Sequence, residues 1–273
     1  MNPHAGPPPR KGTEGASDRV APARGSELGP AGAARGALQD VVFLFDVDNT
    51  LLDNDRVVAD LKAHLMGEFG RASADRYWDG FEQLRRELGY ADYLGALQRY
   101  RQHELLDGSS DPALLQMSAF LIDYPFGDRL YPGALRVLEH LGQSGPTVIL
   151  SDGDVVFQPR KVQRSGLWQA VEGRVLIYIH KELMLREVQQ RHPARHYVMV
   201  DDKLRILAAM KQVLGERLTT VFARQGHYAV DAHNIAAYPA ADITLERIGD
   251  LADVALPTLM APGGACPELQ ENP

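Results

Sequence analysis

Residues 41–50 read VVFLFDVDNT, a continuous apolar run that ends in a group of polar side chains. Uninterrupted apolar runs of this length are typical of a central parallel strand that is covered on both faces. Asp46 and Asp48 follow where such a strand would end. Acids at this place often serve only as turn or cap residues, but carboxylates beside an apolar core need a cation or hydrogen bonds. The stretch therefore predicts a buried strand with an acidic site at its carboxyl end.

The rest of the chain repeats the alternation of strand and helix patterns. Because apolar strand runs separated by helices favour a parallel sheet with helices on both faces, the pattern predicts an α/β fold with a doubly wound, Rossmann-like parallel sheet. The further strand runs are 147–150, 175–179, 197–200 and 219–222, and the helical patterns between them are 134–141, 181–190 and 204–214.

Residues 54–125 differ from the rest, because they contain amphipathic patterns at 57–69, 74–88 and 93–106 but no convincing strand run. We expect an inserted α-helical cap domain there, within a core formed by residues 39–53 and 126–255. The insertion falls between the first two strands, on the side of the sheet where α/β proteins bind ligands. That position predicts a lid over the site.

Both ends of the chain have compositions unlike the core. Residues 1–38 are dominated by Ala, Gly, Pro and isolated charges, so we expect a disordered tail. Residues 256–273 are assigned to a flexible C-terminal tail. The sequence gives no indication of oligomeric state.

Charge and cysteine content narrow the functional classes. The net charge of −7 argues against a broad nucleic-acid or anionic-membrane surface, which would need clustered Lys and Arg. The single cysteine, Cys266, excludes an intrachain disulfide and fits a reducing compartment. No run approaches the roughly 20 apolar residues of a membrane span, and the first ten residues lack a secretory apolar segment. We therefore expect a cytoplasmic protein with no nucleic-acid or membrane partner.

Two other predicted strands also end in polar side chains. Ser151 follows the run at 147–150 and precedes a flexible Asp-Gly turn, which suits phosphate oxygens. Asp201 and Asp202 follow the run at 197–200 and could complete an oxygen shell around a hard divalent cation. Each feature alone is more often a cap. Together with Asp46 and Asp48, they favour one shared site.

These residues carry a resemblance to a known family. The chain resembles the haloacid dehalogenase-like hydrolase superfamily, in particular its phosphatase branch with a helical cap inserted after the first motif. The resemblance extends over about residues 40–250. The matching motifs are DVDNTLL at 46–52, LSDG at 150–153, VDD at 200–202 and the return from the cap, LYPGA, at 130–134.

The resemblance implies a role for each matching position. Asp46 corresponds to the nucleophile, and Asp48 to the acid/base that protonates the leaving alcohol and then activates water. Ser151 and Lys181 correspond to phosphate-binding residues, together with Thr50, which supports the first-motif loop. A Mg²⁺ cofactor would be held by Asp46, the main-chain carbonyl of Asp48, Asp201 and Asp202.

The motif lysine has two candidates. Lys181 starts a predicted helix after the run at 175–179, as the family pattern expects, whereas Lys161 lies in an earlier polar segment, so we choose Lys181. The sequence departs from the family pattern at Glu182, where proline is frequent, and at Arg205, near which a further acid or amide is common.

The expected function is magnesium-dependent hydrolysis of a small phosphorylated metabolite through an aspartyl-phosphate. Alternatives on the same fold are a haloacid dehalogenase, a phosphotransferase and a non-catalytic ligand-binding protein. Asp48 argues against the dehalogenase, whose aspartate attacks carbon without a second acid or a metal. His180 and His227 could contact substrate, although lone histidines are more often structural or exposed. No cap residue is assigned to the site.

Overall fold

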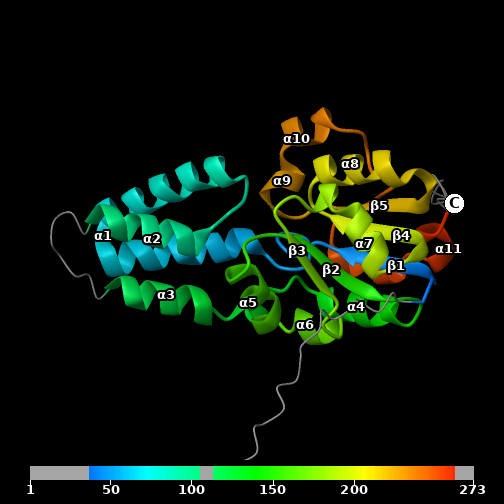
Figure 1. The fold of residues 1–273 in the computed structure, drawn as a ribbon, viewed down its shortest axis with the longest axis horizontal. Helices are drawn as coiled ribbons and strands as arrows, with labels where there is room; N and C mark the ends of the chain where they lie inside the picture. Colours follow the sequence, from blue (N-terminus) through cyan, green and yellow to red (C-terminus); the bar gives the residue numbers. More distant parts are fainter. Residues whose placement is uncertain (1–36, 105–112, 262–273) are drawn as a thin grey trace, which may run out of the picture. The chain divides into compact units, whose positions relative to one another are not determined.

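The computed structural model describes residues 37–104 and 113–261, and its centre is a six-stranded sheet (Figure 1). Every strand pairing is parallel, in the order β3-β2-β1-β4-β5-β6. The predicted doubly wound α/β fold is therefore confirmed. The strands are β1 (Gln39–Phe45), β2 (Thr147–Asp152), β3 (Val175–Tyr178), β4 (Ala194–Asp201), β5 (Leu218–Ala223) and β6 (Ile243–Leu245).

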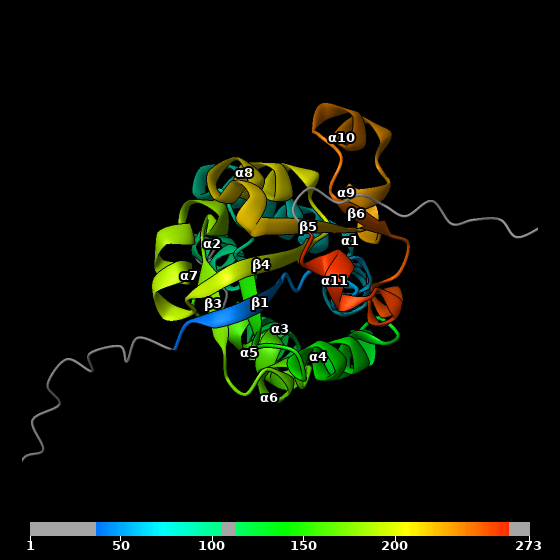
Figure 2. The same ribbon diagram turned by 90° about the vertical axis from the view of Figure 1, so that its right-hand side faces the viewer.

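Helices cover both faces of the sheet, which explains the unbroken apolar run in β1. Val42 and Leu44 pack in one hydrophobic cluster with residues of α7 and α8, whereas Phe43 and Phe45 pack in another with residues of α4 and α5. Figure 2 shows α8 and α4 on opposite sides of the central strands. These helices are α4 (Ala134–Gly142), α5 (Phe157–Arg164), α6 (Leu167–Ala170), α7 (Leu185–Arg191) and α8 (Leu204–Leu214).

The strand order places the ends of β1 and β4 side by side. The chain passes from β1 to β2 and β3 on one side, then crosses to β4 on the other. Phe45 pairs with Val200, so the residues after β1 lie next to the end of β4. Ligands of such sheets bind at this reversal of strand order, outside the carboxyl ends.

Among its described residues, the insertion between β1 and β2 contains three helices: α1 (Asn54–Leu88), α2 (Tyr93–Glu104) and α3 (Ala113–Asp123). The two predicted segments, 57–69 and 74–88, correspond to two helical stretches of α1, which are separated by a kink at the non-helical residue Gly70 (φ 75°, ψ 166°). The described residues here include no strand, as expected, and α3 is an element that the patterns did not reveal. The cap as a separate domain remains a prediction.

The last part of the chain adds short elements: α9 (Gly226–Val230), α10 (Ala232–Ala237) and α11 (Leu256–Leu259), with 3₁₀ turns at Ile248–Asp253 and elsewhere (Phe126–Arg129, Lys181–Leu183, Gly215–Arg217). Leu259 is fully buried in the core, whereas we expected a flexible tail to begin at residue 256; residues 262–273 of that predicted tail lie outside the described residues. The predicted N-terminal tail lies almost wholly outside the described residues. Among the residues that the structure describes, no helix is long and apolar enough to cross a membrane.

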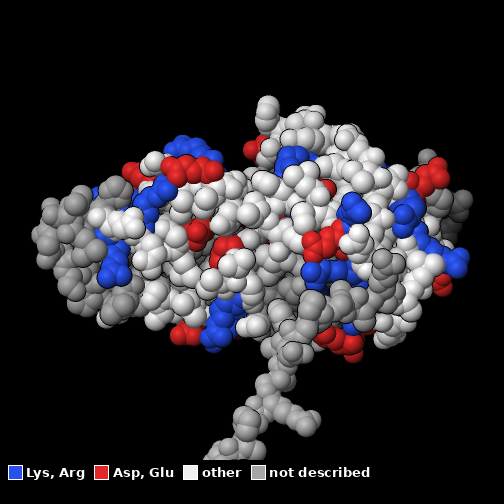
Figure 3. All heavy atoms as spheres, viewed as in Figure 1, with Lys and Arg blue, Asp and Glu red and all other residues white. Residues whose placement is uncertain are grey.

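Charged side chains are interspersed on the face shown in Figure 3, where Lys and Arg alternate with Asp and Glu without forming a single-sign area. Many are paired locally, as Arg191 is with Glu187 and Arg174 with Glu172. Such exposed pairs contribute about 0–1 kcal/mol each, so the fold depends mainly on its two hydrophobic clusters.

We expect Phe43→Ala to lower the free energy of unfolding by about 3–5 kcal/mol, because it opens a cavity beneath the central strand. Phe43 is 0% exposed, whereas Leu38, just before the strand, is 61% exposed. The matched variant Leu38→Ala should therefore change stability by less than about 0.5 kcal/mol. Chemical denaturation followed by circular dichroism measures both, and equal effects would contradict this account of the core.

Candidate active site

The loop after β1 is built by its own backbone hydrogen bonds. The carbonyl of Val47 accepts hydrogen bonds from the amides of Leu51 and Leu52, at 3.0 and 2.9 Å. Asn49 has a positive φ of 62°, and its side-chain oxygen accepts hydrogen bonds from the amides of Asn54 (3.0 Å) and Asp55 (3.1 Å). Asn49 thereby caps the start of α1, which joins the end of the sheet to the helical insertion.

Gly226, the first residue of α9, lies against this loop. It has a φ of 74°, and a Cβ there would collide with the side chain of Asn49. Only glycine combines that backbone conformation with so close an approach. The loop is thus enclosed by residues from distant parts of the chain.

Asp46 is buried under three side chains that contact its carboxylate. The Lys181 ammonium lies 2.5 Å from Oδ1, and the Ser151 hydroxyl donates to the same oxygen over 3.3 Å. The Thr50 hydroxyl donates to Oδ2, also over 3.3 Å. Gln158 supports Ser151 by donating to its hydroxyl over 3.1 Å. The structure thus brings Asp46, Thr50, Ser151 and Lys181 together, as the sequence predicted, while their chemical roles remain predictions.

Lys181 also contacts the second acidic pair. Its ammonium lies 2.7 Å from Asp201 Oδ2, and its own backbone amide donates to Asp152 over 2.8 Å. The 3₁₀ turn after β3 places Lys181 there, whereas Lys161 on α5 contacts Asp48 instead. Of the two candidate lysines, Lys181 is therefore the one that lies at Asp46.

Three carboxylates could hold a cation together. Oxygen atoms of Asp46, Asp201 and Asp202 all lie within 4.8 Å of one another. Asp202 is 1% exposed, and within the described part of the chain neither of its carboxylate oxygens has a hydrogen-bond partner. A buried carboxylate without partners is costly, and carboxylate oxygens are the ligands that Mg²⁺ prefers. The donor set therefore fits the divalent cation that the family resemblance implies.

The pKa values in this cluster follow from burial and from two lysines. Burial acts to raise the pKa of Asp46, but the ammonium groups of Lys181 and Lys203 outweigh it and hold that pKa below its usual value of 3.8. Burial raises the pKa of Asp201 to about 6, although Lys181 partly counters it. Burial also raises the pKa of Asp202 well above its usual value. The excess of buried carboxylates favours a bound cation.

Asp48 lies apart from this cluster and faces a cavity. It is partly exposed, and the buried Lys161 ammonium lies 2.7 and 2.9 Å from its two carboxylate oxygens. The predicted metal contact of Asp48 was through its main-chain carbonyl, so the side chain is left for other chemistry. The two acids that follow β1 are thus each paired with a different lysine.

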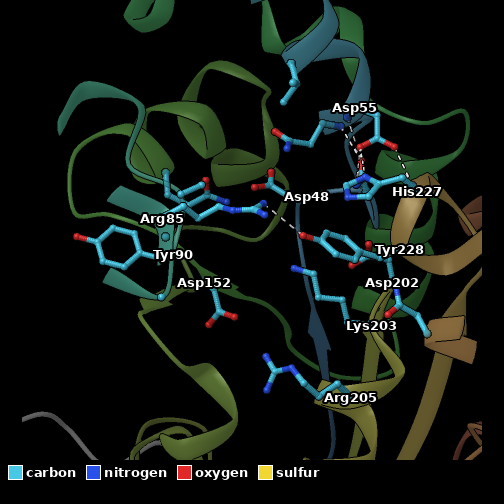
Figure 4. Close-up of a pocket in the computed structure, with 18 of the residues that line it drawn as sticks. Asp48, Asp55, Arg85, Tyr90, Asp152, Asp202, Lys203, Arg205, His227 and Tyr228 are labelled. Atoms are coloured by element: carbon cyan, nitrogen blue, oxygen red, sulfur yellow. Dashed lines mark hydrogen bonds and ion pairs between the residues drawn. The ribbon is translucent and has the colours of Figure 1, made fainter. Parts of the chain in front are cut away.

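The cavity has a volume of about 900 Å³ and separates the sheet edge from α1. Asp48, Asp152 and Asp202 reach it from the sheet, while Trp78, Arg85, Tyr90 and Tyr93 line it from the insertion. In Figure 4, Arg85 and the hydroxyl of Tyr228 face each other across it, joined by a hydrogen bond of 3.5 Å. The helical insertion therefore forms one wall of the cavity.

Several residues that line the cavity were not assigned to the site from the sequence. Lys203 directly follows Asp202, and this adjacency was the available signal for it. Arg85 and Tyr228 could not be assigned to the site from the sequence, because local patterns do not show which face of α1 or α9 meets the cavity. His180 and His227 both line it, and His227 Nδ1 lies 2.6 Å from Asp55.

The two departures from the family pattern meet in the structure. Arg205 donates to Glu182 over 2.6 Å, which links the turn after β3 to α8. The two departing residues therefore form an ion pair beside the site.

Clustered carboxylates, a lysine and a serine at the carboxyl edge of a doubly wound sheet define a hydrolytic enzyme of the α/β class. The chain belongs to the haloacid dehalogenase-like hydrolase family, whose model matches residues 41–213. The predicted superfamily and the prediction of an enzyme are thus confirmed. No protein with a curated description matched the chain.

Similar solved structures agree with this assignment. A haloacid dehalogenase-like hydrolase from Burkholderia xenovorans LB400 is 69% identical, with a TM-score of 0.74, and the match covers 79% of this chain and 96% of that one. The HAD-hydrolase YfnB from Bacillus subtilis, bound to magnesium, is 16% identical (TM-score 0.54; 79% and 98% covered). L-2-haloacid dehalogenase from Xanthobacter autotrophicus is 19% identical (TM-score 0.50; 79% and 98% covered). The last two likenesses show the fold alone.

We expect Mg²⁺ to raise the melting temperature of the wild type in a concentration-dependent manner and Asp202→Asn to lose this effect. At roughly 100 times its Kd, a cation that binds only the folded state contributes about 2.7 kcal/mol. Asp40→Asn is the matched control, because Asp40 is exposed at the opposite end of β1. Differential scanning calorimetry measures the shifts, and an undiminished shift in Asp202→Asn would contradict the cation site.

Proposed function

We propose that this enzyme is a magnesium-dependent phosphomonoester hydrolase that acts on a small phosphorylated metabolite in the cytoplasm, with Asp46 as its nucleophile. The observation that carries the proposal is Asp48, a second carboxylate that faces the cavity while Asp46, Asp201 and Asp202 cluster beneath it. Attack on a carbon–halogen bond needs one carboxylate and neither a second acid nor a metal. Ester hydrolysis at phosphorus uses both.

The first chemical step transfers the phosphoryl group to the enzyme. A carboxylate oxygen of Asp46 forms a bond to phosphorus while the bond from phosphorus to the ester oxygen breaks. Asp48 reacts in its protonated form and gives its proton to the departing oxygen, so the alcohol leaves neutral and Asp48 becomes a carboxylate. Ser151 and Lys181, which contact Asp46, are placed to bind the phosphoryl oxygens.

The second step restores the enzyme. Asp48 removes a proton from water, whose oxygen bonds to phosphorus as the bond from phosphorus to Asp46 breaks. The products are inorganic phosphate, the free Asp46 carboxylate and Asp48 in its protonated form, ready for the next cycle. Mg²⁺, held by Asp46, the main-chain carbonyl of Asp48, Asp201 and Asp202, would neutralise charge on the phosphoryl group and orient it for in-line attack.

The cavity supports a metabolite in preference to a phosphoprotein. The cavity lies between the sheet edge and α1 and has a volume of about 900 Å³. Residues of the insertion line the wall opposite the sheet. Pockets of roughly 300–1,000 Å³ are typical of small-molecule sites.

Phosphate release from a panel of phosphorylated metabolites and an aryl phosphate tests the proposal. We expect wild-type activity with Mg²⁺, loss of activity with chelator, and a loss of at least about 10³-fold in Asp46→Asn, because the amide cannot form the covalent intermediate. Asp40→Asn, at the other end of β1, should keep wild-type activity.

Release of halide from 2-haloacids without added metal, and no phosphate release from any ester, would overturn the proposal in favour of dehalogenation. Full phosphate release by Asp46→Asn would show instead that another residue is the nucleophile.

A further inference from the structure

Lys161 is a buried lysine whose ammonium group is held by two neighbouring side chains. Its side chain is 1% exposed, and its ammonium contacts both carboxylate oxygens of Asp48 (2.7 and 2.9 Å) and the side-chain oxygen of Asn54 (3.0 Å). An ammonium has three donors and no acceptor, so these contacts satisfy it fully. Lys161 therefore has no capacity left to bind another anion in this arrangement.

Asp48 depends on this contact for its orientation. Within residues 37–104 and 113–261, Lys161 provides the hydrogen bonds that its carboxylate accepts. Because one ammonium contacts both oxygens, it fixes the position and the rotation of the carboxylate. Without this contact, the Asp48 side chain could rotate within the cavity that it lines. Proton transfer requires such an orientation, because the acid must lie within hydrogen-bond reach of the leaving oxygen.

The position of Lys161 in the fold gives the contact its rigidity. Lys161 is on α5, beyond β2, and Asp48 follows β1, so the pair joins segments more than a hundred residues apart. α5 also supplies Gln158, which donates to Ser151 one turn earlier. One helix therefore supports both the serine beside Asp46 and the carboxylate of Asp48.

We propose that Lys161 is a positioning residue that holds the Asp48 carboxyl group in place for proton transfer to the leaving oxygen and binds the carboxylate that this transfer produces, with Asn54 fixing the ammonium from the other side. The proposal rests on the phosphohydrolase function above and assigns Lys161 a role distinct from that of Lys181. A purely structural ion pair would affect stability but would not distinguish one leaving group from another.

The test compares kcat/KM for two esters, 4-nitrophenyl phosphate and the best alkyl phosphate of the panel. A nitrophenolate departs with little help from a proton, whereas an alkoxide needs one. We expect Lys161→Met to lower kcat/KM for the alkyl ester at least about tenfold more than for the aryl ester. Because kcat/KM includes only steps up to the first irreversible one, the shared hydrolysis of the intermediate does not mask this difference.

A double-mutant comparison shows whether Lys161 acts through Asp48. Asp48→Asn and the combined variant Asp48→Asn/Lys161→Met should have equal kcat/KM for the alkyl ester, because the lysine has no carboxylate left to position. Lys161→Gln, whose amide can still donate to Asp48, should recover part of the loss. If Lys161→Met fails to fold, the comparison of Lys161→Gln with wild type on the two esters carries the test.

Lys211→Met is the matched control. Lys211 also pairs with an aspartate, Asp242, at 2.7 Å, but it lies on α8 away from the cavity lining. This variant should lose stability without changing the ratio between the two esters.

An equal loss on both esters in Lys161→Met, or losses that multiply in the double variant, would overturn the positioning role while leaving the phosphohydrolase function intact. Absence of phosphate release by the wild type itself would refute the proposed function and this inference with it.

Discussion

The Lys181 ammonium lies between two buried carboxylates, and the arrangement of the site depends on this contact. Asp46 follows β1 and Asp201 ends β4, so parallel pairing alone brings their charges together at the reversal of strand order. Without a cation between them, two carboxylates in this apolar setting would repel each other and pay a large desolvation cost. Removal of one partner from a buried pair typically costs about 3–5 kcal/mol. Lys181 therefore makes the acidic edge of the sheet compatible with folding.

The charge of Lys181 does not neutralise all of the buried carboxylates at this edge, and the remaining negative charge indicates what the site can bind. Lys203 adds a second positive charge, yet among residues 37–104 and 113–261 the Asp202 carboxylate has no hydrogen-bond partner, and burial raises its pKa. Natural proteins rarely leave a buried carboxylate in this state unless a ligand completes it. Asp48, by contrast, has its own lysine and reaches the cavity. The site is thus divided into a buried part suited to a cation and an exposed part suited to proton transfer.

Much of this could be predicted from the sequence, because the strongest signals are local. The run 41–45 must be buried on both faces, and acids after it must lie at the carboxyl edge; the order of strands then brings Ser151 and Asp201 to the same edge. The choice of Lys181 followed from its place after a strand. β6 was missed because a strand of three residues, Ile243–Leu245, produces no apolar run. The division of α1 into two predicted segments agrees with the kink at Gly70.

Contacts between distant segments could not be predicted in the same way. The pairing of Lys161 with Asp48 and of Arg205 with Glu182 depends on how α5 and α8 pack on the sheet, which no short pattern encodes. The cavity wall formed by Arg85 and Tyr90 depends likewise on the face that α1 turns toward the sheet.

The measurement that tests the central claim most directly is mass spectrometry of the protein quenched in acid during turnover of a phosphate ester with Mg²⁺. The account predicts a mass increase of one phosphoryl group on the peptide that contains Asp46. Turnover with no phosphorylated peptide, or with the group on a peptide that lacks Asp46, would contradict it.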